Sequence, residues 1–251
     1  VAEPGEQASD GIATPNSYVW VLSSPNRTDR MFELPTQLSG RDQPLDFVLE
    51  GAAGGMAADA AGSRLAVSCS TPQGTWKLIV FGAERGRFLL ESAPIEYELP
   101  GKAVDVEWLA KANAWGVLCS SPGEPSLTMI SAGGTAAVEI SVRMGGDGAT
   151  VQALVDAGEV VAVVAGGNDL SRPDGAPVTW VRTFAVENPS AVLDAAVPGA
   201  LAGGSSPAFV ASGGLWLVTE VPGIGNATAT RLDLRGGLAV QTVITLPSAV
   251  R

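Results

Sequence analysis

Two carboxylates, Asp105 and Glu107, have the residue types and the spacing best suited to chemistry in this chain. They stand two positions apart in the apolar stretch 104–108, so on a β-strand their side chains lie on the same face. An inner strand would direct that face toward a central channel or a neighbouring sheet. A carboxylate pair about 5 to 9 Å apart suits the acid–base chemistry of glycosidic bond cleavage. The alternative is two polar side chains without a catalytic role, since the sequence shows no neighbour that would tune them.

The chain has no histidine, which restricts the reactions that it can carry out. Ser-His-Asp and Cys-His nucleophiles, His-ligated zinc or haem, and the usual proton shuttle near neutral pH all require it. The glycine-rich stretches 145–148 and 203–204 lack the strand-to-helix context of a phosphate-binding loop. We therefore expect no enzyme activity, no cofactor and no metal site, unless the two carboxylates act.

Cys69 and Cys119 are the two cysteines of the chain, and they stand 119 − 69 = 50 positions apart. Both end an apolar run at the same place in successive repeats. Equivalent positions in neighbouring repeats usually lie beyond the Cα separation of about 7 Å that a disulfide tolerates, although small shifts would bring them together. A disulfide between them is one interpretation, and two buried thiols is the other.

The charge balance is acidic, with 15 Lys and Arg against 26 Asp and Glu and a net charge of −11. Such a chain repels phosphate backbones unless a basic patch intervenes, and the sequence shows none, so we expect no nucleic-acid partner. The longest apolar runs, such as 160–165, fall far below the ~20 residues needed to cross a bilayer, so we expect no transmembrane segment. The acidic composition fits an exported protein, either periplasmic or extracellular.

A repeat of about 49 residues runs through the chain. Pro100, Pro198 and Pro247 each end an apolar run, and their separations are 198 − 100 = 98 and 247 − 198 = 49. These are two units and one unit of a length that is typical of β-propeller blades.

Two turns keep the same register as the prolines. Asp59 to Gly62 and Asp156 to Gly158 each precede an apolar run, at an offset of 156 − 59 = 97. Glycine supplies the positive φ of a tight hairpin, and aspartate accepts a hydrogen bond from its own backbone two residues on. We therefore expect Asp59, Gly62, Asp156 and Gly158 to stabilise turns and not to bind a substrate.

Each unit contains short stretches rich in β-branched and aromatic residues between Gly, Pro and Ser turns, which predicts four strands per unit. A shorter first unit has three such stretches, at 18–22, 31–34 and 47–49. Residues 1–14 are mostly small, polar or acidic, so we expect a flexible amino-terminal arm there. The sequence thus predicts an all-β fold of five units in a single domain over residues 15–251, with almost no helix and a short first unit.

The strand, Asp-x-x-Gly turn and apolar strand over residues 58–67 resemble the repeats of WD40-like and YVTN-type β-propellers. The resemblance spans about residues 17 to 248 and implies a β-propeller of about five four-stranded blades. The same blade serves scaffolds, receptors and enzymes, so the fold does not fix the function.

From these observations we expect a non-catalytic interaction module, an accessory or scaffold subunit that docks on another protein, such as one in a membrane-associated complex. The alternative follows from the resemblance. Five-bladed propellers that cleave glycosidic bonds use carboxylates around the channel, and in this chain Asp105 and Glu107 would take that place in a carbohydrate-active protein.

Overall fold

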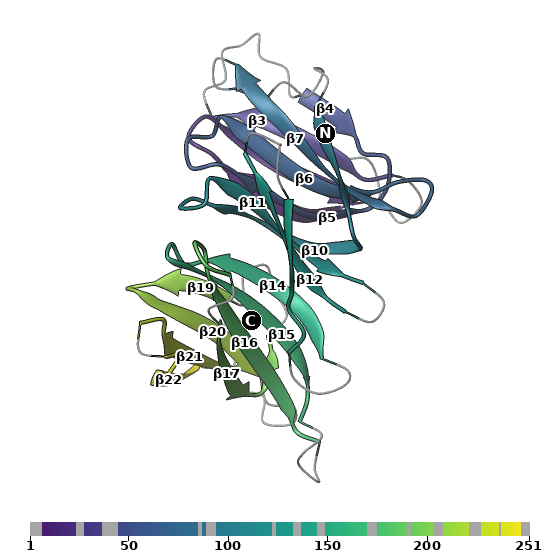
Figure 1. Cartoon of the computed structure of the whole chain (residues 1–251). Helices are drawn as coiled ribbons and strands as arrows, with labels where there is room; N and C mark the ends of the chain where they lie inside the picture. Colours follow the sequence, from purple (N-terminus) through teal and green to yellow (C-terminus); the bar gives the residue numbers. More distant parts are fainter. Residues whose placement is uncertain are drawn as a thin grey trace. The chain divides into compact units, whose positions relative to one another are not determined.

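The computed structural model describes residues 7–23, 28–36, 45–84, 87–88, 94–121, 124–132, 137–144, 149–169, 175–189, 192–202, 208–220, 227–235 and 237–246. These residues form five antiparallel sheets, each built on a path of four strands, and they contain no helix (Figure 1). No helix in the described part of the chain is long and apolar enough to span a membrane. The predicted all-β fold is confirmed.

The first sheet contains four strands: β1 (Gln7–Ala13), β2 (Ser17–Ser23), β3 (Arg30–Pro35) and β4 (Leu45–Val48). This corrects two expectations, because residues 7–13 are a paired strand and not a flexible arm, and the first unit is not short of a strand. The backbone of β1 pairs antiparallel with β2, from Gln7 opposite Ser23 to Ala13 opposite Tyr18. Backbone pairing to an apolar strand needs no large side chains, which is why this polar segment gave no strand signal. Residues 1–6 of the predicted arm lie outside the described residues.

The second and third sheets repeat the pattern. The second contains β5 (Ala53–Ala58), β6 (Arg64–Ser70), β7 (Trp76–Glu84) and β9 (Ile95–Leu99), and the short β8 (Arg87–Phe88) pairs antiparallel with the end of β7. The third contains β10 (Lys102–Leu109), β11 (Ala114–Ser120), β12 (Ser126–Ser131) and β13 (Ala137–Ser141).

The fourth and fifth sheets complete the five units. The fourth contains β14 (Thr150–Asp156), β15 (Val160–Asn168), β16 (Pro177–Ala185) and β17 (Val192–Pro198). In the fifth, the first strand is divided into β18 (Ala200–Leu201) and β19 (Ala208–Ala211), and both parts pair with β20 (Gly214–Glu220). The strands β21 (Ala227–Asp233) and β22 (Val240–Leu246) follow.

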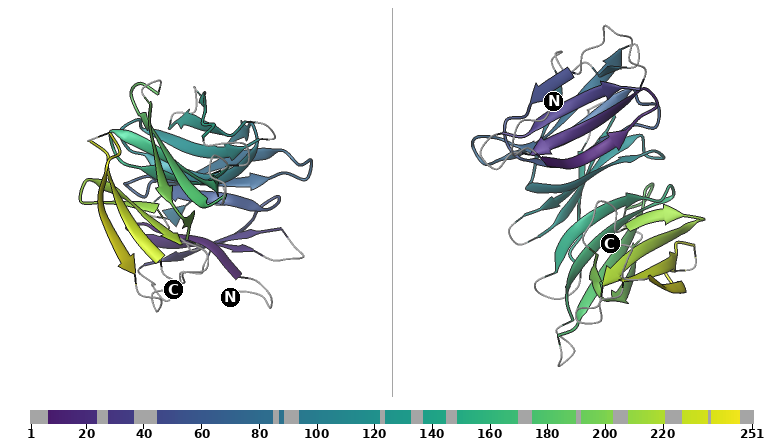
Figure 2. Two further views of the ribbon diagram at one scale, coloured as in Figure 1. Left: turned by 90° about the horizontal axis from the view of Figure 1, so that it is seen from below. Right: turned by 180° about the vertical axis from the view of Figure 1, so that it is seen from behind.

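The chain divides into two compact units, the first over residues 1–123 and 127–139 and the second over 124–126 and 140–251. Unit 1 holds the first three sheets, which lie side by side in both views, and unit 2 holds the fourth and fifth sheets (Figure 2). The single domain over residues 15–251 stays a prediction.

The second sheet is the middle layer of unit 1 and buries both of its faces. On β6, Leu65 and Val67 join the core cluster shared with the first sheet, whereas Ala66 joins the cluster shared with the third. A strand with two buried faces needs apolar residues at successive positions, which explains the continuous run at Leu65–Val67. Unit 2 has a comparable core between its two sheets, with Val164 and Val181 packed in one cluster with Leu215.

A glycine and a hydroxyl at the start of the third and the fifth sheet account for the recurring Pro-Gly pairs. Gly101 follows β9, and a Cβ there would lie 2.3 Å from Ser121 Oγ and 2.9 Å from the carbonyl oxygen of Ser120. Ser121 Oγ donates to the carbonyl of Pro100 at 3.2 Å. Gly199 has the same relation to Thr219, whose hydroxyl donates to the carbonyl of Pro198 at 3.3 Å. At each of these two Pro-Gly pairs, the chain enters a new sheet and packs closely against the end of the second strand of that sheet. The close approach explains why the Pro-Gly pairs recur.

Candidate functional site

The predicted carboxylates lie on β10, the first strand of the third sheet. Asp105 pairs with Leu118 and Glu107 with Gly116 of β11, and both side chains are half-buried. Val106 between them is buried in the core cluster shared with the second sheet, so the two carboxylates project from the other face of the strand. The backbone N–H of Val106 donates to Asp105 Oδ1 at 2.9 Å. One carboxylate oxygen of Asp105 thus accepts a hydrogen bond from the backbone of its own strand.

A register shift marks the same point in the first strand of four sheets. It falls between Ala8 and Asp10, between Ala53 and Gly55, between Ala103 and Asp105, and between Val151 and Ala153. A β-bulge of this kind bends its strand and redirects the following side chain. Asp10, Gly55 and Asp105 therefore occupy equivalent positions on three first strands of unit 1.

Asp10 is the residue that the sequence analysis missed. Its Oδ1 accepts a hydrogen bond from the backbone N–H of Gly11 at 2.7 Å, the geometry that Asp105 has with Val106. The Asp10 side chain reaches solvent, yet desolvation by the surrounding protein raises the pKa of its carboxyl, and hydrogen bonds from the backbone of Gly11 and Met56 lower it by less. The repeat would have shown Asp10 only if residues 7–13 had been recognised as the missing first strand.

Gly55 stands between the two aspartates in the order of the strands. A Cβ at Gly55 would lie 2.9 Å from the backbone nitrogen of Val106 and 3.0 Å from the Cα of Asp105, so β5 and β10 approach at backbone distance. Asp10 and Asp105 therefore lie on the first strands of the first and third sheets, and the first strand of the second sheet has Gly55 at the equivalent position. Among the residues that the structure describes, no group of three Cys, Asp or Glu side chains is arranged to hold a metal ion.

The turn residues have local partners. Asp59 Oδ1 accepts from the backbone N–H of Ser63 at 2.6 Å and of Arg64 at 3.1 Å, and Gly62 has a φ of 64°. Asp156 Oδ1 accepts from the N–H of Gly158 at 3.0 Å, and Gly158 has a φ of 79°. These contacts all lie within their own turns. The contribution of each carboxylate to stability stays a prediction.

The two cysteines are free and buried, so the disulfide interpretation is corrected. Cys69 belongs to the core cluster between the first and second sheets, and Cys119 to the cluster between the second and third. The second sheet separates the two clusters, which prevents a bond. Burial is the main cause that raises the pKa of each thiol to about 11, so both stay protonated and unreactive near neutral pH.

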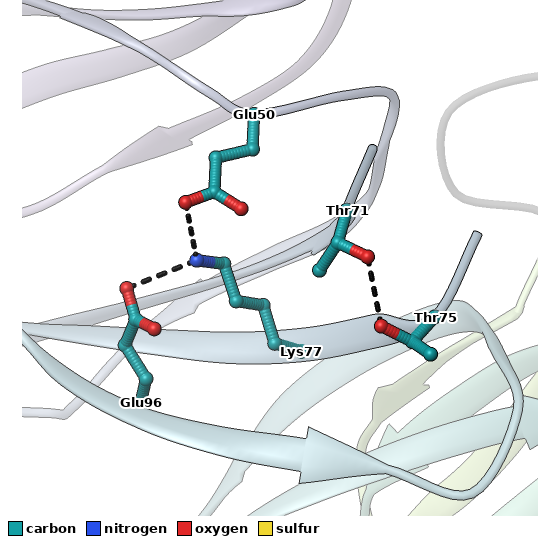
Figure 3. Close-up of polar contacts among 5 residues, drawn as sticks. All are labelled: Glu50, Thr71, Thr75, Lys77 and Glu96. Atoms are coloured by element: carbon teal, nitrogen blue, oxygen red, sulfur yellow. Dashed lines mark hydrogen bonds and ion pairs between the residues drawn. The ribbon is translucent and has the colours of Figure 1, made fainter. Parts of the chain in front are cut away.

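Lys77 forms the best-defined charged cluster of unit 1. Its Nζ lies 2.9 Å from Glu50 Oε1 and 3.0 Å from Glu96 Oε1 (Figure 3). Burial lowers the pKa of Lys77, but hydrogen bonds and attraction to the two glutamates outweigh it, so the net effect raises that pKa. The cluster joins the segment before β5 to β7 and β9. Because the lysine is fully charged and doubly paired, it fits a structural clamp and not a nucleophile.

Large apolar side chains are exposed on three strands of unit 2. They are Val192 and Leu193 on β17, Phe209 and Val210 on β19, and Val240, Val243 and Ile244 on β22. Unit 1 exposes single side chains on its strands, such as Ile95 on β9 and Val138 on β13. Because successive residues of a strand face opposite sides of the sheet, these side chains add apolar surface to both faces of β17 and β19.

Five sheets of four strands, with apolar cores between adjacent sheets of each unit, are the architecture of a β-propeller. No protein-family model and no curated protein matches the chain. Solved structures of low identity share the fold.

One of these is from a complex of nidogen with laminin, with a TM-score of 0.56 and 10% identity over 93% of this chain and 81% of that chain. Another is the β-propeller domain of the trilobed protease from Pyrococcus furiosus, with a TM-score of 0.50 and 8% identity over 96% and 84%. A puromycin-hydrolysing peptidase from Mycobacterium tuberculosis has a TM-score of 0.64 and 16% identity, and the chain covers 38% of its length against 98% of its own. The chain is therefore a β-propeller in fold, and its neighbours include both an enzyme and a component of a protein complex.

Proposed function

We propose that this propeller is a non-catalytic interaction module, an accessory or scaffold subunit that docks on another protein. The observation that carries the proposal is the exposure of adjacent apolar residues on β17 and β19. Phe209 and Val210 are 42% and 39% exposed, and Val192 and Leu193 are 41% and 44% exposed. Because each of these side chains is already more than half buried, a partner that covered the rest would gain about 0.6–1.3 kcal/mol for each one.

The chemistry of the described residues supports the same proposal. The thiols are buried with pKa values of about 11, and Lys77 is held by two carboxylates. As part of the proposal we place the protein outside the cytoplasm, in the periplasm or the extracellular space, where the acidic chain would meet a partner such as a membrane-associated complex. The complex of nidogen with laminin supports the idea that this fold can serve protein assembly.

The test is capture of partners from native membranes or culture supernatant by the tagged full chain, followed by affinity measurement with the purified partner. We expect the Leu193→Ala and Phe209→Ala variants to bind about tenfold more weakly or worse, since about 1.4 kcal/mol corresponds to a factor of ten. Ile95→Ala removes a large apolar side chain from unit 1 that is 54% exposed, and it is the control. Equal binding by all three variants would show that neither β17 nor β19 contacts the partner.

The carbohydrate-active alternative is favoured by one observation, the equivalent placement of Asp10 and Asp105 on first strands of unit 1. A second carboxylate from another strand is what an acid–base pair requires. The alternative predicts turnover or binding of oligosaccharides that is lost in Asp10→Asn and Asp105→Asn, with partner capture unchanged. Glycoside hydrolysis or sugar binding that survives both substitutions would exclude this pair.

A further inference from the structure

The strand β22 has an unusual exposure for a sheet strand. Six of its seven residues, from Val240 to Thr245, are exposed, so both faces meet solvent. Val243 is 59% exposed and Ile244 is 45% exposed. β22 is also the last strand in the order of the fifth sheet, so its outer backbone edge has no strand partner among the described residues.

Charge distinguishes β22 from the other outer strands. Each of the other four carries carboxylates: Asp46 on β4, Glu96 and Glu98 on β9, Glu139 on β13, and Asp194 on β17. Charged side chains on an edge strand discourage pairing with another chain. The sequence of β22, Val-Gln-Thr-Val-Ile-Thr-Leu, has no charge and is rich in β-branched residues. Such a strand keeps the propensity for pairing and has no charged side chain to discourage it, although a β-bulge at Gln241 interrupts its ladder with β21.

The side-chain contacts between β21 and β22 also involve a neutral residue where other sheets have a carboxylate. In the first and fourth sheets, a third-strand arginine pairs with an outer-strand carboxylate, as in Arg30–Asp46 and Arg182–Asp194. In the fifth sheet, Arg231 donates instead to the neutral side chain of Gln241. Gln241 in turn donates to Asp233 Oδ2 at 2.8 Å, so the charges nearest to β22 are of opposite sign and are joined through an amide. The edge is locally neutral in a chain whose net charge is −11.

We propose that β22 pairs antiparallel with β22 of a second copy of this chain, forming a two-fold symmetric dimer with a continuous sheet. A pairing centred on Val243 places Thr242 opposite Ile244 of the second copy, in the part of β22 that follows the β-bulge at Gln241. Cross-strand pairs of β-branched and aliphatic residues stabilise such a ladder. A second copy is the occupant that the charges favour, because self-pairing of any other outer strand would bring carboxylates of two acidic chains together. This inference does not rest on the proposed function, which uses β17 and β19.

The first experiment measures the mass of the full chain against concentration by sedimentation equilibrium. We expect the mass to rise from 25.5 kDa toward twice that value, and the association to strengthen with salt because each copy carries a charge of −11. Val243→Lys places two cations opposite one another at the two-fold axis, so we expect at least a tenfold weaker association with an unchanged melting temperature. Val138→Lys, on the outer strand β13 and 51% exposed, is the matched control and should associate as the parent does.

A covalent test fixes the register and does not depend on the folding of the lysine variant. In the proposed pairing, position 243 lies opposite itself, with Cα atoms about 4.5–5.5 Å apart, within the Cα separation of about 4.4–6.8 Å that a disulfide spans. Under mild oxidation, two thiols of the V243C variant would lose two electrons and two protons to an added disulfide such as oxidised glutathione and form a cross-linked dimer. In T245C the two new thiols would be about 13 Å apart, so this variant should stay monomeric. The native cysteines are both buried and do not compete.

A parent that stays monomeric at every concentration and salt would overturn the proposal. Equal cross-linking of V243C and T245C would overturn it as well, and so would a parent monomer whose β22 binds a different protein. Loss of partner binding in the β17 and β19 variants, with dimerisation retained, would separate this surface from that of the proposed function.

Discussion

Gly101→Ala tests whether the recurring Pro-Gly pairs have the structural cause assigned to them. The new Cβ would lie 2.3 Å from Ser121 Oγ, 2.9 Å from the carbonyl oxygen of Ser120 and 3.2 Å from its carbonyl carbon. The hydroxyl can rotate away, at the loss of its hydrogen bond to the carbonyl of Pro100. The backbone carbonyl cannot rotate, because Ser120 is the last residue of β11 and pairs with Lys102. The substitution therefore has to displace the connection between β9 and β10.

Overpacking of this kind costs about 1–3 kcal/mol, and a lost hydrogen bond about 1 kcal/mol. For a chain of this size, about 1 kcal/mol lowers the melting temperature by about 2–4 °C, so we expect a fall of about 4–16 °C by calorimetry. The control is Gly82→Ala on β7, where a Cβ meets nothing within 4 Å. That variant should melt within about 2 °C of the parent or slightly above it, because alanine reduces the entropy of the unfolded chain. Equal melting of the two variants would refute the proposed cause of the recurring Pro-Gly pairs.

Three further predictions follow from the same contacts. Asp156→Ala should lower the free energy of unfolding by about 0.5–2 kcal/mol without affecting partner binding, and a loss of binding at unchanged stability, seen by calorimetry and affinity measurement, would contradict this. Removal of residues 1–14 should lower the melting temperature and promote aggregation in light scattering, because it removes β1 and exposes the edge of β2; melting like the parent would show that β1 adds nothing. The thiols have pKa values raised from 9.0 to about 11, so their contribution to stability is present below pH 9 and is lost as the pH rises from 9 to 11. A pH series of urea unfolding should therefore show a steeper loss over that interval in the parent than in a Cys69→Ala, Cys119→Ala variant.

The fold was largely predictable because its signals repeat. The expected strands at 18–22 and 31–34 lie within β2 and β3. The failure concerned residues 7–13, where the strand has the sequence Gln-Ala-Ser-Asp-Gly-Ile-Ala. This segment forms a strand because it pairs with the backbone edge of β2. Its own residues have little β-propensity, so the segment alone does not indicate a strand. One signal pointed to this strand: the first unit showed three predicted strands, whereas the other units showed four.

The candidate site was predictable only in part, for a related reason. The alternation of Val104–Trp108 placed Asp105 and Glu107 on one face of a strand, which periodicity can show. The equivalence of Asp10 with Asp105 depends on a bulge in each strand, and a bulge shifts the register by one residue without a fixed residue type. The separation of Cys69 from Cys119 depends on which face of the second sheet each one meets. A count of positions between repeats cannot supply that information.

The placement of charge bears most directly on the choice between chemistry and binding. Arg30–Asp46, Lys77–Glu96 and Arg182–Asp194 each join the third and the outer strand of a single sheet. An active site instead gathers charged groups from several elements at one point, where burial and mutual repulsion shift their pKa values for catalysis. Here the ionic pairs are spread over the outer strands, and the apolar exposure concentrates on β17, β19 and β22 of unit 2. Charges arranged in this way protect most sheet edges and leave a few apolar strands uncovered, which supports the proposed docking role.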